Sequence, residues 1–480
     1  MKLLIIGLDS AAPKLVFDKW GEELPNLKNL MAKGIHGALE TAHPPITVPA
    51  WTVMMSSKDP GQLGCYGFRN RKDHSYDSYT IANATAVRYD RAWDIVSRAG
   101  KKVILLGVPQ TYPTKPINGY IVTDFLTPST KSDYTYPLEL KNEVEKVSGG
   151  YVLDVENFRT PDKEALLERI YDKTKKHFKV AKHLITTKPW DFFMLVEMGV
   201  DRIHHGFWSF MDPEHHKYRA GNPFEDAIKN YYRYCDREIG ELLSLVPKDT
   251  IVMVVSDHGA RKMDGGICFN EWLIKEGYLT LKEYPSQPTS ISDVEIDWSR
   301  TMAWGDGGYY GRLFMNVKGR EPQGVVDPKE YEKIRSELIQ KIEAIEDPEG
   351  RNIGSRAYRP EELYREVNGV APDLIVYFGN LNWRSVGSVG LRSIYTFEND
   401  TGPDEANHDW QGIFILNEMG CRGGNLEPGY KEGLKIYDIG PTVLNLFGLE
   451  SNNNPIGKSL TNYKEEGFFD RLKARLGLQN

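Results

Sequence analysis

The chain opens with LLIIGLDS at residues 3–10, where the apolar run Leu3–Ile6 is followed by Gly-Leu-Asp-Ser. The run is apolar at every position, which is typical of a strand covered on both faces. The same character recurs further along the chain, and we predict a buried strand at each site: Val103–Leu106, Phe192–Val196, Ile251–Val255, Leu374–Tyr377 and Ile413–Leu416.

Helical patterns lie between these strands, for example at Phe224–Val246 and Tyr331–Ile345. Strands that alternate with helices predict an α/β three-layer sandwich with a mainly parallel central sheet. We expect a single domain over 1–480, with insertions at about 110–185 and 275–370, and a cap within 275–400. The segment GFFDRLKARLGL at 467–478 is predicted to form a short amphipathic helix.

The composition is that of a folded globular protein, because 40% of the 480 residues are apolar and 26% are charged. Collagen-like, coiled-coil and mainly disordered chains are therefore excluded. The net charge of −7 argues against a nucleic-acid partner. The four cysteines form no CxxC pair, which excludes a thiolate zinc site and suits a reducing compartment: Cys65, Cys235, Cys268 and Cys421.

Targeting signals are not apparent in this sequence. The first apolar run is too short for a signal peptide, and no run approaches the roughly 20 residues that span a bilayer. We therefore predict a cytoplasmic protein without a membrane span, and leave its oligomeric state open.

Acidic residues and histidines follow three of the predicted strands. Asp9 follows the first strand, Asp201 and His205 follow the Phe192 strand, and Asp257 and His258 follow the Ile251 strand. Sites in open α/β sheets assemble at the carboxyl ends of strands. We therefore expect these side chains to meet at one edge of the sheet.

The spacing of these residues favours metal binding. Asp201 and His205 are four residues apart and share a helical face, so both can reach one metal, whereas His204 would point elsewhere. His408 precedes another predicted strand. Imidazole and carboxylate without thiolate suit Zn²⁺, and such sites also accept Mn²⁺. Two such metals clamp the attacking and leaving oxygens of a displacement at phosphorus.

A nucleophile is predicted in the segment TAHPPITVPAWTVMM, residues 41–55. Thr47 precedes Val48-Pro49, and a proline is accepted in the first turn of a helix. Thr47 is therefore a candidate helix cap, and its oxygen would lie where the helix dipole favours an anion. If the hydroxyl also faces a metal, it would be activated for attack.

Taken together, the ordered motifs resemble the alkaline phosphatase superfamily, in its type I phosphodiesterase/nucleotide pyrophosphatase branch. The motifs are GLDS, ITVPAW, DPGQLGCYGF, VDRIHH, SDHG, NHDWQGIFI, IYDIGPTVLNLFGL and IGKSL. The resemblance implies a two-metal hydrolase of phosphate esters or nucleotides with Thr47 as nucleophile. It further implies one metal held by Asp9, Thr47, Asp257 and His258, and another held by Asp201, His205 and His408.

Two departures from the branch concern the phosphate. The branch usually carries an asparagine four residues after the glycine that aligns with Gly64, and here that position is Phe68. Asn70 lies two residues later, between Arg69 and Arg71. An arginine near the site would favour a monoester dianion, because a guanidinium can bind the terminal phosphate in a bidentate manner. His204, Arg261 and Lys262 are further candidate phosphate contacts.

A diesterase is nevertheless the preferred interpretation, with a phosphomonoesterase of the same superfamily as the alternative. A sulfatase would need Cys or Ser at the nucleophile, and a phosphate-shuffling mutase would use Ser, whereas this chain has Thr47. A noncatalytic metal-binding protein is the alternative outside the enzymes. Metal analysis with a general diester assay separates it from an enzyme.

Overall fold

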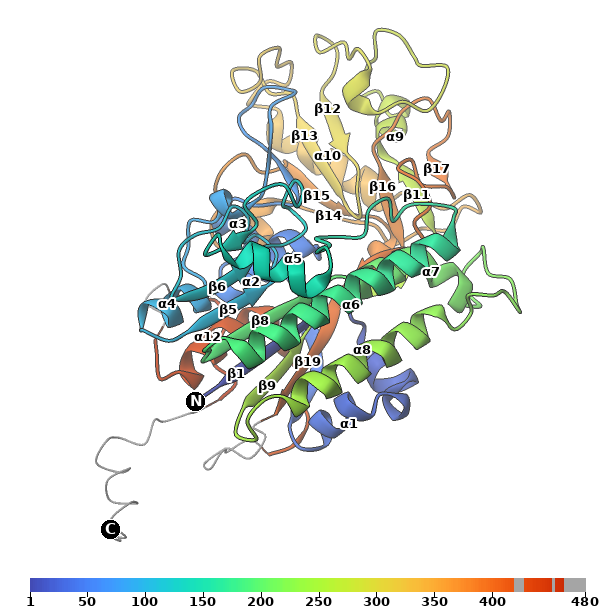
Figure 1. Cartoon of the computed structure of the whole chain (residues 1–480). Coiled ribbons are helices and arrows are strands. Elements are labelled where there is room, and N and C mark those ends of the chain that lie inside the picture. The colour runs from blue at the N-terminus through green and yellow to red at the C-terminus, as the bar shows by residue number, and fades with distance from the viewer. Residues whose placement is uncertain (418–426, 451–453, 462–480) are drawn as a thin grey trace, which may run out of the picture.

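A large sheet forms the centre of the computed structural model (Figure 1). Among the described residues, which are 1–417, 427–450 and 454–461, ten strands form this sheet in the order β20-β2-β19-β9-β1-β8-β5-β6-β7, with β21 also paired to β2. Their bounds are Leu3–Leu8 (β1), Ile35–Glu40 (β2), Val103–Leu106 (β5), Gly119–Val122 (β6), Thr135–Tyr136 (β7), Phe192–Glu197 (β8), Ile251–Val255 (β9), Gln411–Asn417 (β19), Gly429–Tyr430 (β20) and Leu434–Lys435 (β21).

Helices cover both faces of this sheet, so the predicted three-layer sandwich is confirmed. In β1, Leu4 and Ile6 face one apolar layer, whereas Leu3 and Ile5 face the other. The first layer is formed with Pro25–Ala32 (α1), Lys163–Thr187 (α6), Gly199–Met211 (α7) and Ala227–Ser244 (α8). The second layer is formed with Thr47–Ser56 (α2), Ala92–Arg98 (α4) and Ile439–Leu446 (α12). Two further helices of this part are Pro60–Leu63 (α3) and Leu140–Ser148 (α5).

The sheet is mainly parallel, as predicted, because β9, β1, β8, β5 and β6 run in the same direction. Strand β19 is antiparallel to both of its neighbours, β9 and β2. The prediction for Leu374–Tyr377 was right about the strand, but this strand (β15) belongs to a different, antiparallel sheet. A continuous apolar run indicates burial on both faces and does not tell which sheet provides it.

A second apolar core lies beyond the central sheet, in the upper part of Figure 1. Its main sheet has the order β12-β13-β15-β14, and we call this part, residues 265–396, the cap. Its strands are Gly265–Cys268 (β11), Ala303–Asp306 (β12), Gly311–Met315 (β13), Arg356–Tyr358 (β14), Leu374–Tyr377 (β15), Trp383–Val386 (β16) and Tyr395–Thr396 (β17), and its helices are Phe269–Lys275 (α9), Tyr331–Glu343 (α10) and Pro360–Leu363 (α11).

Two short antiparallel pairs complete the strands of the described part of the chain. They are Arg69–Arg71 (β3) with Tyr79–Ile81 (β4), and Gly259–Lys262 (β10) with Ala406–Asp409 (β18). The insertion expected at about 110–185 is partly wrong, because β6 and β7 extend the central sheet and α6 packs on its face. The helix predicted at 467–478 lies outside the described residues.

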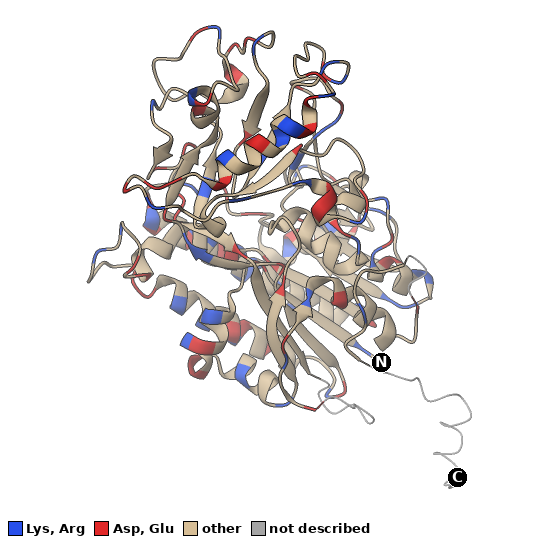
Figure 2. Ribbon diagram, turned by 180° about the vertical axis from the view of Figure 1, so that it is seen from behind, with Lys and Arg blue, Asp and Glu red and all other residues tan. Residues whose placement is uncertain are grey.

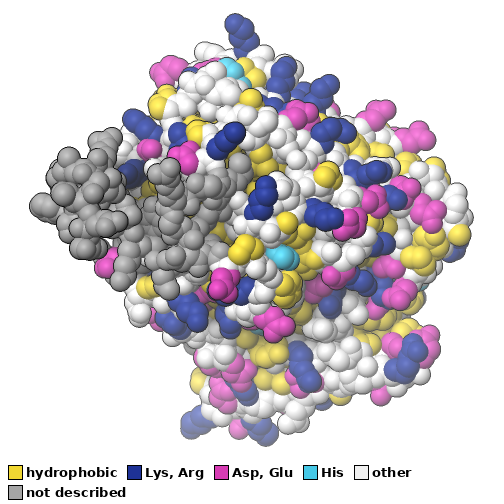
Figure 3. Space-filling model, turned by 90° about the horizontal axis from the view of Figure 1, so that it is seen from below, with side chains coloured by type: hydrophobic (Ala, Val, Ile, Leu, Met, Phe, Trp, Pro, Cys, Tyr) yellow, Lys and Arg dark blue, Asp and Glu magenta, His cyan; other side chains and the backbone are white. Residues whose placement is uncertain are grey.

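Charged residues lie mostly on helices and loops, while the central strands are nearly free of them (Figure 2). On the face seen from below, residues of both signs are interspersed (Figure 3). No helix among the described residues is both long enough and apolar enough to cross a bilayer. Cys65, Cys235 and Cys268 are buried free thiols.

Candidate metal centre

Three neighbouring strands in the middle of the sheet deliver the predicted site residues. Strands β9, β1 and β8 are adjacent and parallel, and their carboxyl ends lead to Asp257, Asp9 and helix α7 respectively. The side chains of Asp9, Asp257 and His258 are buried, as are those of Asp201 and His205 on α7. The expectation that these residues meet at one sheet edge is confirmed.

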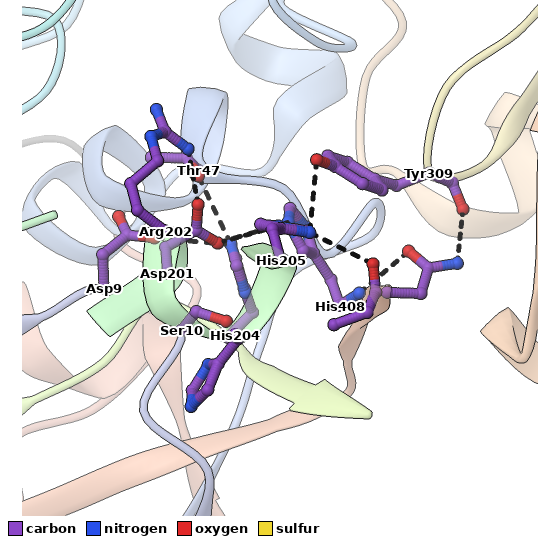
Figure 4. Close-up of polar contacts among 12 residues, drawn as sticks. Asp9, Ser10, Thr47, Asp201, Arg202, His204, His205, Tyr309 and His408 are labelled. Carbon is purple, nitrogen blue, oxygen red and sulfur yellow. Dashed lines mark hydrogen bonds and ion pairs between the residues drawn. The ribbon is translucent and has the colours of Figure 1, made fainter. Parts of the chain in front are cut away.

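Helix α7 presents Asp201 and His205 on one face, as their spacing predicted. His205 Nε2 lies 3.1 Å from Asp201 Oδ1. The ring of His204 points away from this group (Figure 4) and shares a 3.1 Å hydrogen bond with the hydroxyl of Tyr232. His204 therefore packs in the core between helices, and the candidate role as a phosphate contact is wrong.

Asp201, His205 and His408 form a first group of candidate ligands. His205 Nε2 lies 3.1 Å from Asp201 Oδ1 and 3.3 Å from His408 Nε2, and the His408 Nε2 to Asp201 Oδ1 distance is 3.7 Å. Ligand atoms about 2.0–2.1 Å from a tetrahedral zinc ion are about 3.3–3.4 Å apart. The three atoms therefore match one triangular face of a tetrahedral site.

A second group surrounds His258. Its Nε2 atom lies 3.2 Å from Asp257 Oδ2, 3.4 Å from Thr47 Oγ1 and 3.9 Å from Asp9 Oδ1. These four residues are the set that the resemblance implied for one metal. Asp201 also lies within reach of Asp9 and His258, so this carboxylate stands between the two groups.

All three imidazoles present the same nitrogen to the centre. Nδ1 of His258 lies 3.0 Å from the carbonyl oxygen of Gly259, and Nδ1 of His408 lies 2.8 Å from that of Pro45. Nδ1 of His205 lies 2.7 Å from a carboxylate oxygen of Asp404. Since each of these oxygens can only accept, each Nδ1 carries a proton, and Nε2 is the ring nitrogen that faces the centre and would bind a metal.

The carboxylates are likewise incomplete without a cation. Asp9 Oδ1, Asp201 Oδ1 and Asp257 Oδ2 are buried and accept no hydrogen bond from any described residue. Burial, followed by the charges of Asp257 and Asp201, raises the pKa of Asp9 well above its usual range. Burial is also the main cause that raises the pKa of Asp257. Oxygen and imidazole donors of this kind fit divalent ions such as Zn²⁺ or Mn²⁺.

Thr47 stands at the start of helix α2 but does not cap it. Ile46 occupies the capping position without a side-chain hydrogen bond, and Val48 leaves the helical conformation at φ −109°, ψ 109°. The predicted cap is therefore wrong, because this kink turns the Thr47 hydroxyl toward His258 instead. The positive end of the helix dipole still lies beside the hydroxyl, where it favours an anion.

Two residues that the sequence did not single out hold the carboxylates in place. The indole nitrogen of Trp51 donates a 2.7 Å hydrogen bond to Asp9 Oδ2. Arg202 donates a 2.6 Å hydrogen bond to Asp201 Oδ2, and its other nitrogens bind Asp154. Trp51 lies four residues after Thr47 on the same helix. This spacing places it on the helix face of Thr47, and it was the signal in the sequence that could have identified Trp51 as part of the site.

In the loop expected to bind phosphate, the side chains of Phe68 and Asn70 make other contacts. Phe68 packs against Phe125, at 5.8 Å between ring centroids. The side chain of Asn70 accepts from Tyr66 N at 2.7 Å and donates to Gly67 O at 2.9 Å, so it closes its own turn. Neither residue replaces the asparagine of the branch.

The candidate cations are also paired elsewhere. Arg71 is buried against Glu321 of the cap, at 3.3 Å. Arg261 pairs with Asp409 at 3.0 Å, and Lys262 pairs with Asp264 at 2.9 Å. Arg69 is exposed on β3, and no contact of its side chain is seen within the described part of the chain. A guanidinium from this loop does not reach Thr47.

Solved structures with the same fold include two kinds of enzyme. Human ectonucleotide pyrophosphatase/phosphodiesterase 5 is 12% identical, with a TM-score of 0.56 over 94% of this chain and 96% of that chain. Phosphonoacetate hydrolase from Sinorhizobium meliloti 1021, in complex with phosphonoacetate, is 15% identical, with a TM-score of 0.60 over 92% and 94%. No curated protein matches the sequence.

The sequence model described as "Type I phosphodiesterase / nucleotide pyrophosphatase" matches residues 3–404. That range contains β1, Thr47, helix α7 and the residues that follow β9. The match confirms the resemblance drawn from the ordered motifs. The chain therefore belongs to the type I phosphodiesterase/nucleotide pyrophosphatase family.

Proposed function

We propose that this protein is a metal-dependent hydrolase of phosphate esters, with Thr47 as the nucleophile and a diester as the preferred substrate. One observation carries the proposal. Three buried carboxylate oxygens without hydrogen-bond donors and three imidazole Nε2 atoms surround a hydroxyl at the start of a helix. Each carboxylate and each imidazole is oriented by a contact on its outer side, which for Asp257 is a 3.2 Å hydrogen bond from Ser10 N, so these ligands are positioned before substrate arrives.

The residues proposed to hold one ion are Asp9, Thr47, Asp257 and His258, and those proposed for the other are Asp201, His205 and His408. Two divalent ions bound there, Zn²⁺ by preference or Mn²⁺, would ionise the threonine hydroxyl and neutralise charge on the attacking and leaving oxygens. The protein supplies four carboxylate and hydroxyl oxygens and three neutral imidazoles, a donor set without thiolate.

The reaction proceeds in two displacements at phosphorus. The Thr47 hydroxyl gives up its proton and its oxygen forms a bond to phosphorus, while the bond to the leaving oxygen breaks and the leaving alcohol takes up a proton. With a diester substrate, the phosphoryl group on Thr47 still carries its other alcohol. Water then attacks the phosphorus atom, and the threonine oxygen leaves and regains its proton. Arg202 and Trp51 hold Asp201 and Asp9 by their outer oxygens throughout, so the inner oxygens keep their direction.

The preference for a diester rests on charge. A monoester carries nearly two negative charges at neutral pH and favours a site with extra cationic donors, whereas a diester carries one. Arg71, Arg261 and Lys262 are each paired with a carboxylate and are not free to supply such donors. A nucleotide is a fitting part of the substrate, since an inactive variant of murine ectonucleotide pyrophosphatase/phosphodiesterase 5, which has this fold, is solved in complex with AMP.

The test compares Thr47→Ala with Thr47→Ser at saturating metal. The alanine variant should lose activity on the order of 10³-fold or more, because the attacking atom is gone, whereas serine retains a hydroxyl. Acid quenching of the wild type with a diester substrate should trap on residue 47 a phosphoryl group that still carries one alcohol, detected by mass spectrometry. Equal activity of the alanine variant would show that Thr47 is not the nucleophile.

The substrate class is tested by kcat/KM for bis-p-nitrophenyl phosphate and p-nitrophenyl phosphate with the same metal and pH. We expect the diester to be favoured. A monoester preference above tenfold, about 1.4 kcal/mol of differential transition-state binding, would overturn the diesterase assignment. A cytoplasmic location, predicted from the sequence, is also proposed and is tested by fractionation of cells that express the full chain.

A further inference from the structure

His205 differs from the other two imidazoles in its outer partner. His258 and His408 each face a backbone carbonyl through Nδ1, whereas Nδ1 of His205 lies 2.7 Å from the Asp404 carboxylate and, at the longer distance of 3.1 Å, from the carbonyl oxygen of Ala406. The side chain of Asp404 is completely buried. Asp404 is 199 residues from His205 in sequence and does not belong to the ligand set that the resemblance implied.

The second oxygen of Asp404 is held by three donors. Asp404 Oδ2 accepts from Arg159 Nε at 2.9 Å and from the Tyr309 hydroxyl at 3.2 Å, and a nitrogen of Arg384 lies 3.5 Å away. Both oxygens of Asp404 therefore have partners, and its position is determined by contacts on either side.

These donors come from outside the layers of the central sandwich. Tyr309 lies in the turn between β12 and β13 of the cap, Arg384 lies on cap strand β16, and Arg159 lies just before α6. The ring of Tyr309 stacks on that of His205 at 4.8 Å and lies 4.2 Å from that of His408. Figure 4 shows Tyr309 beside both histidines.

We propose that Asp404 is a positioning residue for His205, and that the cap, through Tyr309 and Arg384, holds Asp404 in that role. A carboxylate that accepts the Nδ1 proton keeps the imidazole in one tautomer and one orientation and makes Nε2 a stronger donor to a metal. The centre is then completed only when the cap is docked. The inference rests on the proposed function, in which His205 binds one of two ions.

A different role for Asp404 would be a purely structural contact between the cap and the central sandwich. Such a structural contact would affect the stability of the fold without changing the affinity of the centre for metal. The cap offers a matched control in Asp373, which is also buried and is held by Arg320 at 2.8 Å and by the hydroxyl of Tyr331 at 2.5 Å, with no histidine among its contacts in the described chain.

The experiment compares Asp404→Asn, Asp373→Asn and Tyr309→Phe with the wild type in the full chain. Dissociation constants for Zn²⁺ are measured by competition with a chromogenic chelator, and stability is measured by urea unfolding. Asp404→Asn should weaken one of the two ions by about 10- to 100-fold and leave the other near its wild-type affinity. Asp373→Asn should bind both ions as the wild type does, even where it is less stable.

Tyr309→Phe keeps the ring stacked on His205 and removes the hydroxyl, which donates to Asp404 and accepts from Arg159 at 2.8 Å, so it should weaken the same ion by about fivefold. This variant carries the test if Asp404→Asn does not fold. Zn²⁺ affinities within threefold of wild type in the folded variants at Asp404 and Tyr309 would overturn the positioning role. Asp404 would then be only a structural contact between the cap and the sandwich. A wild-type chain that binds no ion would refute the metal centre, and the role of Asp404 with it.

Discussion

The hydrogen bond from Trp51 to Asp9 provides a sharp test of how the centre is built. The indole nitrogen donates to Asp9 Oδ2 at 2.7 Å, and both side chains are completely buried. Trp51→Phe keeps an aromatic ring and removes this donor. The metal binds the ionised carboxylate, whereas the metal-free carboxyl favours its proton because burial and neighbouring charges raise its pKa. The loss of the donor therefore weakens mainly the metal-bound state.

A hydrogen bond to a buried charged group is worth about 1.5–3 kcal/mol. That range corresponds to about a 10- to 150-fold increase in the dissociation constant for the metal. The smaller ring also leaves a cavity, which lowers stability by itself. The control is Trp93→Phe, because Trp93 is equally buried in the same apolar layer and is not a partner of Asp9 among the described contacts.

Metal affinity is measured for both variants by chelator competition with Zn²⁺ and with Mn²⁺, and stability is measured by thermal unfolding. Both variants should be less stable than wild type, but only Trp51→Phe should bind metal more weakly. If the two variants bind metal equally, or if Trp51→Phe stays within threefold of wild type, Trp51 does not support the centre through Asp9.

Three further predictions concern the ions and the cap. Removal of metal with EDTA should abolish hydrolysis and lower the melting temperature, because Asp9 and Asp257 lose their compensating charge; an unchanged melting temperature would speak against a structural contribution of the ions. Asp257→Asn and His205→Ala should each lower the metal-to-protein ratio in elemental analysis, and normal two-ion binding by both would show that the ligand assignment is wrong. Arg71→Met should cost about 1.5–3 kcal/mol in urea unfolding, because it breaks the buried pair with Glu321, while the diester-to-monoester ratio of kcat/KM stays unchanged; a shifted ratio would place Arg71 at the substrate.

Local sequence patterns were sufficient to predict the strands and the helix that carry the site residues. The apolar runs of β1, β8 and β9 predicted buried strands, and the acids and histidines after them predicted the sheet edge where they meet. The four-residue spacing of Asp201 and His205 predicted their shared helical face. These features depend on contacts within a few residues, or on a rule of parallel sheets, and so are visible in the sequence.

Long-range packing decided the rest. The kink at Val48 directs the Thr47 hydroxyl away from a helix cap, and β15 joins the cap sheet although its apolar run resembles those of the central strands. Arg71 was a candidate phosphate contact until its pairing with Glu321, 250 residues away, was visible. Asp404 reaches His205 across a similar separation. Local patterns therefore identify which chemical groups stand at the sheet edge. Which of their atoms are already paired, and which face the centre, depends on the tertiary fold, because a hydrogen-bond partner far along the chain leaves no local pattern.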